Sequence, residues 1–319
     1  TATADVEDTI DTTTVAVTAN PAKEGDANVT FNFQLSNPPQ GTSTLTVKVG
    51  ETTYTVNVDA SGKGTLVVPN TNGEDVYKDG STLTATVTGV NGGNYEATNL
   101  TGASATADVK DTVDTTTVSL TGSVQSEGST AQYVFTATLS HASQGVTTIT
   151  TDKGVITIAD GETTGTLKID AANGEDVYKD GSELVATITG VNGPGFEKLE
   201  IKDGSGSATA KVVDTETAST VSLSGSIQNE GSTAQYVFTA TLSHASQGVT
   251  TITTDKGMIT IADGETTGTL KIDAANGEDV YKDGSELVAT ITGVDGPGFE
   301  KLEVKDGSAT AKVVDTETA

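Results

Sequence analysis

The sequence Gly-Glu-Asp-Val-Tyr-Lys-Asp-Gly-Ser occurs three times in this chain of 319 residues, beginning at Gly73, Gly174 and Gly277. Its copies therefore lie 101 and 103 positions apart. A second motif, Asp-Thr-x-Asp-Thr-Thr-Thr-Val, begins at Asp8 and again at Asp111 and gives the same period. A fixed period indicates a repeat architecture, and one of this length is close to the commonest domain size. We predict three modules, at residues 1–111, 112–214 and 215–319.

Alternating segments predict that each module is all-β. In module one Val29, Phe31, Phe33 and Leu35 alternate with polar residues, which is the period of two expected of a half-buried strand. Similar segments, separated by Gly- and Asp-rich turns, recur about every ten residues, a spacing typical of immunoglobulin-like sandwiches. The predicted fold is three tandem immunoglobulin-like β-sandwiches arranged end to end as an extended rod.

The acidic composition excludes several kinds of partner. Asp and Glu number 44 against 17 Lys and Arg, a net charge of −27, so a nucleic-acid backbone would be repelled. No apolar run approaches the roughly 18 to 20 residues that cross a bilayer, so membrane insertion is not expected. The chain has no Cys, and stabilisation beyond packing would have to come from bound metal. Because both ends resemble the linkers between modules, we interpret the chain as a piece of a longer array.

Acidic turns are expected to gather where one module meets the next. If successive strands alternate in direction, the lower end of each module collects its first turn, the Asp152 turn in module two, the repeated Gly-Glu-Asp loop and the exit strand. The facing top of module three would present the His244 loop and the turns at Asp263 and Asp295. Calcium takes six to eight oxygen ligands from such loops, whereas softer metals would require Cys or His.

The sequence therefore predicts calcium at the junctions, although acidic turns are also common simply because they are solvated. Thr217 stands at the second junction where the first has Asp114, so the two sites are expected to differ. The candidate ligands of the first junction are Glu24, Glu74, Asp75, Asp79, Asp111 and Asp114. Those of the second are Glu127, Glu175, Asp176, Asp180, Asp214 and Glu216. Those at the lower end of module three are Glu230, Glu278, Asp279, Asp283 and Asp315.

Several motifs resemble the extender repeats of giant bacterial adhesins of the repeats-in-toxin class. They are the Asp-Thr-x-Asp linker, the Glu-Gly after the first strand, the Glu-Asp-Val-Tyr-Lys-Asp-Gly-Ser loop and the Ala-Thr-Ile-Thr-Gly-Val-x-Gly strand. The resemblance covers the whole chain. It implies a secreted, extracellular array at the bacterial cell surface, stiffened by calcium, that projects a distal ligand-binding region away from the cell. The implied partners are calcium ions and the neighbouring modules of the same adhesin, with the chain itself monomeric.

The residues also bear on two alternative functions, catalysis and direct adhesion. Catalysis is not expected, because His141 and His244 occupy one equivalent loop position and no Cys or second His accompanies them. The stronger alternative is that the modules themselves form an adhesive surface for glycan, protein or ice, since residues 147–151 are rich in Thr. Modules two and three repeat each other almost residue for residue, which favours a spacer over a specialised receptor.

Overall fold

The structure is a computed structural model that describes residues 1–316. Its contacts divide the chain into two compact units. The first unit comprises Thr1–Leu120, Ala137–Thr166 and Thr187–Gly206. The second comprises Thr121–Thr136, Leu167–Ala186 and the residues from Ser207 onward. The linker after module one thus lies wholly in the first unit, and the linker after module two lies wholly in the second.

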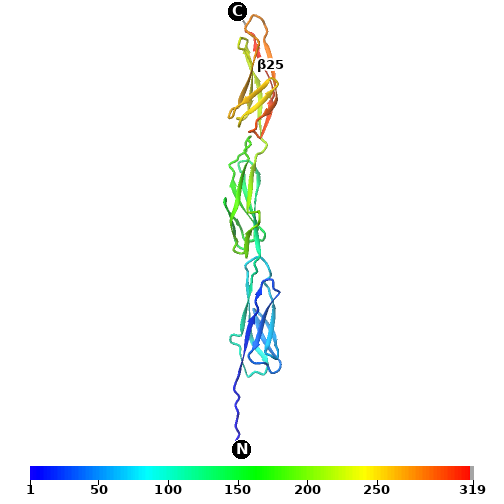
Figure 1. The fold of residues 1–319 in the computed structure, drawn as a ribbon, viewed down its shortest axis with the longest axis vertical. Coiled ribbons are helices and arrows are strands. Elements are labelled where there is room, and N and C mark those ends of the chain that lie inside the picture. The colour runs from blue at the N-terminus through cyan, green and yellow to red at the C-terminus, as the bar shows by residue number, and fades with distance from the viewer. Residues whose placement is uncertain (317–319) are drawn as a thin grey trace. The chain divides into compact units, whose positions relative to one another are not determined.

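Each module contains nine strands within the described residues, and Figure 1 traces them in chain order. The strands of module one are β1 (Thr12–Ala19), β2 (Ala22–Lys23), β3 (Asn28–Leu35), β4 (Ser43–Val49), β5 (Thr52–Val58), β6 (Lys63–Pro69), β7 (Ser81–Gly92), β8 (Ala97–Asn99) and β9 (Ser104–Lys110). Those of module two are β10 (Thr115–Gly122), β11 (Val124–Ser126), β12 (Gln132–Leu139), β13 (Thr147–Thr151), β14 (Gly154–Ile158), β15 (Thr164–Asp170), β16 (Ser182–Asn192), β17 (Lys198–Ile201) and β18 (Ser207–Val213). Those of module three are β19 (Ala218–Gly225), β20 (Ile227–Asn229), β21 (Gln235–Leu242), β22 (Thr250–Thr254), β23 (Gly257–Ile261), β24 (Thr267–Asp273), β25 (Ser285–Asp295), β26 (Lys301–Asp306) and β27 (Ser308–Val314).

Every module pairs its strands into a four-stranded and a five-stranded sheet. In module one the orders are β6-β3-β1-β8 and β2-β9-β7-β4-β5, and the same arrangement recurs in modules two and three. Two sheets whose strands carry apolar residues on one face bury that face by packing together. The prediction of an all-β chain of tandem immunoglobulin-like modules is confirmed.

The core of module one lies where the alternating pattern predicts it. Val29, Phe31, Phe33 and Leu35 of β3 are all at most 2% exposed and belong to one hydrophobic cluster. Module three has an equivalent cluster that includes Phe238 and Leu242. None of the described residues forms a helix that could cross a membrane.

Two of the strand pairs in each module are parallel. The short strand β2 pairs with the last strand, β9, and β1 pairs with β8. The first pairing carries the chain to the module's carboxyl end just before Glu24, and it therefore fixes where that glutamate lies.

Candidate metal centre

Parallel pairing brings two acidic residues side by side at the end of each module. Lys23 of β2 and Lys110 of β9 are register partners, and Glu24 and Asp111 follow them directly. The Glu24 amide donates to the Lys110 carbonyl at 3.0 Å. The matching pairs are Glu127 with Asp214 and Glu230 with Asp315, where the glutamate amides donate to Val213 and Val314 at 2.9 Å.

Glu24 is the most buried carboxylate of the first junction, only 2% exposed. Its Oε1 accepts hydrogen bonds from the amide and hydroxyl of Thr112, at 2.6 and 3.1 Å. Gly25 follows with a φ of 72°, and a Cβ added there would lie 2.7 Å from Glu74 Oε2. Glycine is therefore required beside this glutamate. Glu127 and Glu230 hold Thr215 and Thr316 in the same way.

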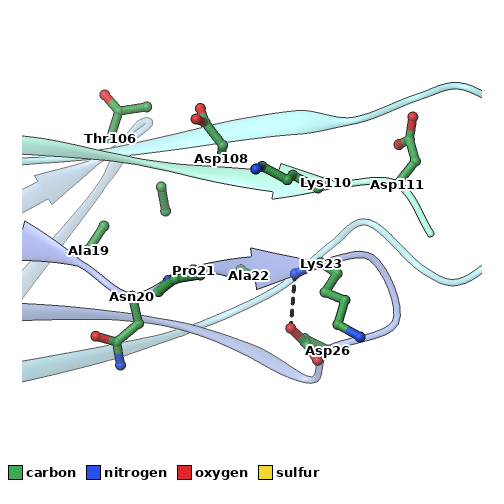
Figure 2. Close-up of a pocket in the computed structure, with 11 residues that line it drawn as sticks. Ala19, Asn20, Pro21, Ala22, Lys23, Asp26, Thr106, Asp108, Lys110 and Asp111 are labelled. Carbon is green, nitrogen blue, oxygen red and sulfur yellow. Dashed lines mark hydrogen bonds between the residues drawn. The ribbon is translucent and has the colours of Figure 1, made fainter.

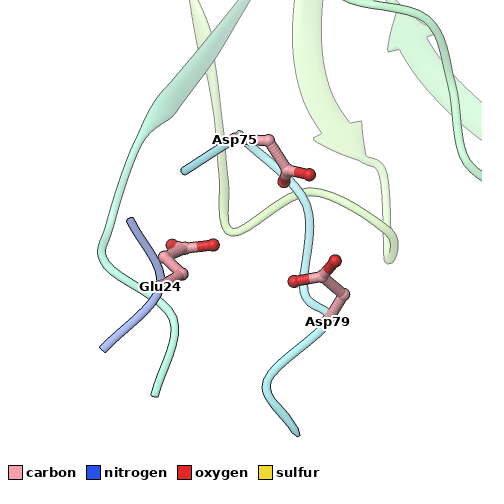
Figure 3. Close-up of side chains that lie close together, drawn as sticks. All are labelled: Glu24, Asp75 and Asp79. Carbon is pink, nitrogen blue, oxygen red and sulfur yellow. The ribbon is translucent and has the colours of Figure 1, made fainter. Parts of the chain in front are cut away.

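The repeated loop supplies two further carboxylates, Asp75 and Asp79 in module one. The Asp75 Oδ1 accepts the Tyr77 amide at 2.7 Å, which closes a turn within the loop. Asn72 donates its side-chain amide to the Asp79 carbonyl at 3.3 Å. Figure 3 shows Glu24 on one chain segment and Asp75 and Asp79 on another, with their carboxylates around a common space. Local hydrogen bonds thus fix the loop so that both aspartates face Glu24.

The same loop binds the next module through a short β-bridge. Tyr77 pairs with Phe196 of module two: the Lys78 amide donates to the Gly195 carbonyl, and the Glu197 amide donates to the Val76 carbonyl, both at 3.0 Å. The Tyr77 and Phe196 rings stack with centroids 5.6 Å apart and planes at 25°. The Tyr77 hydroxyl donates to the Ala142 carbonyl at 2.8 Å. Tyr77 therefore both packs on module two and hydrogen-bonds to it.

Docking delivers a glutamate of module two into the acidic cluster of module one. Glu197 follows Phe196, and its Oε2 accepts the linker amide of Asp114 at 2.6 Å. In module one the Asp11 amide makes the same bond to Glu96 at 2.6 Å. The aromatic residue therefore anchors the loop, and the glutamate after it orients both the linker and the site.

The second junction repeats this arrangement within the second unit. Tyr178 bridges and stacks on Phe299, with centroids 5.5 Å apart, and its hydroxyl donates to the Ala245 carbonyl at 2.9 Å. Lys179 and Glu300 donate their amides across the bridge at 3.0 Å, and Glu300 accepts the Thr217 amide. At module three's own loop, Val280 is 81% exposed and Tyr281 is 72% exposed. The loop is thus covered only where a following module docks on it.

Carboxylate oxygens converge within 4.8 Å of one another in five groups among residues 1–316. Glu24 belongs to both groups of the first junction and Glu127 to both groups of the second. The groups are Glu24, Asp75 and Asp79; Glu24, Asp111 and Glu197; Glu127, Asp176 and Glu300; Glu127, Asp180 and Asp214; and Glu230, Asp283 and Asp315. Each junction thus joins five carboxylates from two modules around one buried glutamate.

Not every predicted ligand reaches these groups. Glu175 Oε1 accepts the hydroxyls of Thr215 and Thr217 at 2.7 and 2.6 Å, and Glu74 and Glu278 accept the hydroxyls of Thr112 and Thr316. Among the described carboxylates, Asp114, Glu216 and Asp279 lie outside the five groups. Asp152 accepts the Thr187 amide at 2.7 Å and pairs with Lys153. Glu74, Glu175 and Glu278 of the repeated loop therefore hydrogen-bond to linker threonines and do not join the carboxylate groups.

The sequence prediction did not include Glu197 and Glu300. The loops expected to face the site were those at His244, Asp263 and Asp295: the Asp295 turn continues into Gly298-Phe299-Glu300, which docks, and Ala245, next to His244, accepts the Tyr178 hydroxyl. Asp263 instead accepts the Gly248 amide within module three. An aromatic residue followed by Glu at the same position of every module, Tyr95-Glu96, Phe196-Glu197 and Phe299-Glu300, is the signal that could have identified them.

Crowding of carboxylates changes their acidity. Burial raises the pKa of Glu197 and Glu300, and the neighbouring Glu24 and Glu127 carboxylates raise it further. Burial and the adjacent Asp75 or Asp176 raise the pKa of Asp79 and Asp180. Hydrogen bonds from the Thr217 and Thr215 hydroxyls lower the pKa of Glu175. Without a cation, ionising Glu197, Glu300, Asp79 and Asp180 is therefore less favourable than ionising an isolated carboxyl group.

A pH dependence follows for the second junction in chelator. Glu300 binds its proton more tightly when folded than when unfolded, so its contribution to stability is full below its ordinary pKa of 4.5 and is lost as pH rises through the raised value. We expect the bridge between modules two and three to open more often as the pH rises from acidic to neutral. Saturating calcium should suppress this increase. Hydrogen exchange of the Lys179 and Glu300 amides, corrected for intrinsic rates, measures it. A pH-independent opening would contradict this prediction.

The donor set fits calcium. Every group is made of carboxylate oxygens, and buried oxygen atoms of Glu24, Asp111 and Glu197 accept no hydrogen bond. The same holds at the equivalent Oε2 atoms of Glu127 and Glu230, at Glu300 Oε1, and at the side-chain carbonyls of Asn173 and Asn276. A buried polar atom without a partner is costly. Oxygen ligands without nitrogen or sulfur are those preferred by calcium.

These features define a class of protein: tandem immunoglobulin-like modules joined by acidic, interlocked junctions. The family model of the LapA domain matches three consecutive segments, residues 11–112, 114–215 and 217–316. The chain therefore belongs to the LapA domain family, and its resemblance to the extender repeats of large bacterial adhesins is confirmed.

Two solved structures show low similarity to the chain. One similar structure comes from work on host cell surface retention of a 1.5-MDa bacterial ice-binding adhesin; it is 13% identical, with a TM-score of 0.32, over 97% of this chain and 100% of that chain. Another is the I9–I11 tandem of titin, 14% identical, with a TM-score of 0.21, over 95% of this chain and 100% of that chain. No curated protein sequence matches the chain.

Proposed function

We propose that the chain is a calcium-rigidified spacer segment of a bacterial cell-surface adhesin, which projects a distal ligand-binding region away from the cell. The observation that carries the proposal is the cluster at each junction, where Glu24 or Glu127 of one module and Glu197 or Glu300 of the next leave buried oxygens without hydrogen-bond donors. Since both modules contribute, whatever neutralises the cluster also holds the two modules together.

The proposed mechanism is a change in junction stiffness. Bound calcium supplies positive charge that offsets carboxylate repulsion. The repeated loop of one module and the Gly-Phe-Glu loop of the next contribute ligands from opposite sides, so their β-bridge and ring stack are reinforced. Without calcium the same carboxylates repel one another and the linker bends. An extracellular location suits this mechanism, because calcium sites of extracellular modules have millimolar to submillimolar dissociation constants.

Family membership and the repeated, similar modules support a structural rather than a catalytic role, and we propose that the chain is not an enzyme. The His141 ring contacts the hydroxyls of Thr116 and Ser140, at 3.2 and 3.0 Å, and His244 contacts Ser219 and Ser243 in the same loop of module three. Each histidine therefore serves to hold its loop.

Small-angle scattering tests the proposal directly. We expect the maximum dimension of the chain to decrease when calcium is replaced by chelator, and to recover when calcium is added back. A magnesium arm serves as the ionic-strength control, because magnesium demands tighter octahedral geometry than flexible carboxylate loops offer. An unchanged maximum dimension in chelator would refute rigidification by calcium.

A further inference from the structure

In each module a parallel strand pair joins the region near its amino end to its last strand. These pairs, β2–β9, β11–β18 and β20–β27, are here called the terminal clamps. Tension along the chain pulls the first strand of such a pair towards the amino end and the last strand towards the carboxyl end. In a parallel pair this loads all the inter-strand hydrogen bonds together, so the force needed to separate them rises with their number.

The terminal clamp of module one is the shortest. It has two register pairs, whereas those of modules two and three have three each. In module two Ser123 and Glu127 bond to the last strand, so Val124, and Pro21 at the same position of module one, have their backbone nitrogens turned away from the last strand of their module. The bond from the Lys211 amide to the Ser123 carbonyl, 2.8 Å, recurs in module three from Lys312 to Ser226. Within the described chain, module one lacks its counterpart from Asp108 to Asn20.

A side chain explains why this part of module one stands apart from β9. Gly122 lies so close to the last strand of module two that an added Cβ would be 2.2 Å from the Thr209 carbonyl oxygen, and Gly225 has the same relation to Thr310. Module one has Ala19 at this position. Its Cβ prevents the close approach, and a pocket opens between the segment Ala19–Lys23 and β9. Figure 2 shows Ala19, Asn20 and Pro21 on one side of it and Thr106 and Asp108 on the other.

The second parallel pairing ranks the modules in the same order. The pair β1–β8 has three register pairs, β10–β17 has four and β19–β26 has five. Both shear-loaded pairings are thus weakest in module one. Glu24, Glu127 and Glu230 follow the terminal clamps at the same position of all three modules, and the smallest set of grouped carboxylates lies in module three, so bound cations do not explain why module one ranks lowest.

We infer that module one is the load-limiting module of the chain, which unfolds first under tension and releases its length before modules two and three yield. This role adds to that of a stiff spacer, because it sets the force at which the segment lengthens. It rests on strand pairing and does not depend on the proposed calcium sites.

Single-molecule force spectroscopy of the full chain tests the inference, in calcium and in chelator. A flexible insert of about 20 residues between Gly50 and Glu51, in the exposed hairpin of β4 and β5, lengthens the unfolding step of module one by ~70 Å and so marks it. We expect the lengthened step to come first in nearly every trace. Its force should be lower than that of the later steps, because its terminal clamp has two register pairs against three.

Reciprocal variants link the order to the terminal clamp. Ala19→Gly with Pro21→Val in module one should abolish the preference, so that the lengthened step comes first in about one trace in three. Gly122→Ala with Val124→Pro should weaken the terminal clamp of module two, so that the first unfolding step of a trace comes from either module one or module two. Pro69→Val, in the antiparallel pair of β3 and β6, is the matched control and should leave the order unchanged. A lengthened step that comes first at random in the unaltered chain, or that stays first after Ala19→Gly with Pro21→Val, would overturn the inference.

Discussion

Replacing Glu127 by glutamine is expected to lower the calcium affinity of the second junction by on the order of a hundredfold, since affinity at such sites follows the number of charged ligands. Glu127 belongs to both carboxylate groups of this junction and is 6% exposed. Its loss removes negative charge from both groups at once. Isothermal titration of the full chain with calcium should show that binding at the second junction is lost from the measured range, while binding at the first junction is unchanged.

Glu175→Gln is the matched control for Glu127→Gln. Glu175 lies in the same junction, but its carboxylate accepts the hydroxyls of Thr215 and Thr217 outside the oxygen groups. We expect the calcium affinity of the second junction in the Glu175→Gln variant to change by less than about threefold, because a glutamine carbonyl can accept the same hydroxyls. Equal losses in the two variants would show that Glu127 is not the central ligand.

Replacing Tyr178 by alanine should loosen the second junction even when calcium is saturating. The change removes the ring stack on Phe299 and the hydrogen bond to Ala245, worth together about 2 kcal/mol. Opening of the junction should therefore become roughly 30-fold more frequent. Hydrogen exchange of the Lys179 and Glu300 amides, which cross the bridge, measures this directly.

Tyr281→Ala provides the control for Tyr178→Ala at an identical loop sequence. Tyr281 is 72% exposed, so its removal should leave both junctions unchanged and should change the free energy of unfolding of module three by less than about 0.5 kcal/mol. If the two variants increase exchange equally, the stack on Phe299 does not hold the modules together.

The sequence allowed the modules and one side of each junction to be predicted, for physical reasons. Repetition shows where a module recurs, and alternation identifies strands whose direction determines at which end each loop lies. This reasoning placed Asp75, Asp79 and Asp111 at one end with Glu24. It could not show that the Glu74 carboxylate would be taken up by a linker threonine, because that depends on side-chain distances of about 3 Å.

Glu197 and Glu300 were missed for a different reason. Strand direction identifies all the loops at the top of a module but does not say which of them reaches the neighbour. That choice depends on Phe196 and Phe299, which are 1% exposed and hold the loop against the tyrosine of the preceding module. The aromatic residue and the Glu recur in every module, but recurrence alone does not show that the ring stacks on the tyrosine of the preceding module.

The composition of each linker has an evolutionary consequence. Each linker lies in the same compact unit as all the carboxylates grouped around it. Unequal recombination between the nearly identical modules two and three would therefore add or delete one whole period. The exchanged ends are equivalent, so each new linker would again receive a complete set of acidic residues and a docking aromatic residue. Such an exchange would change the number of modules without producing a junction that lacks part of its acidic set.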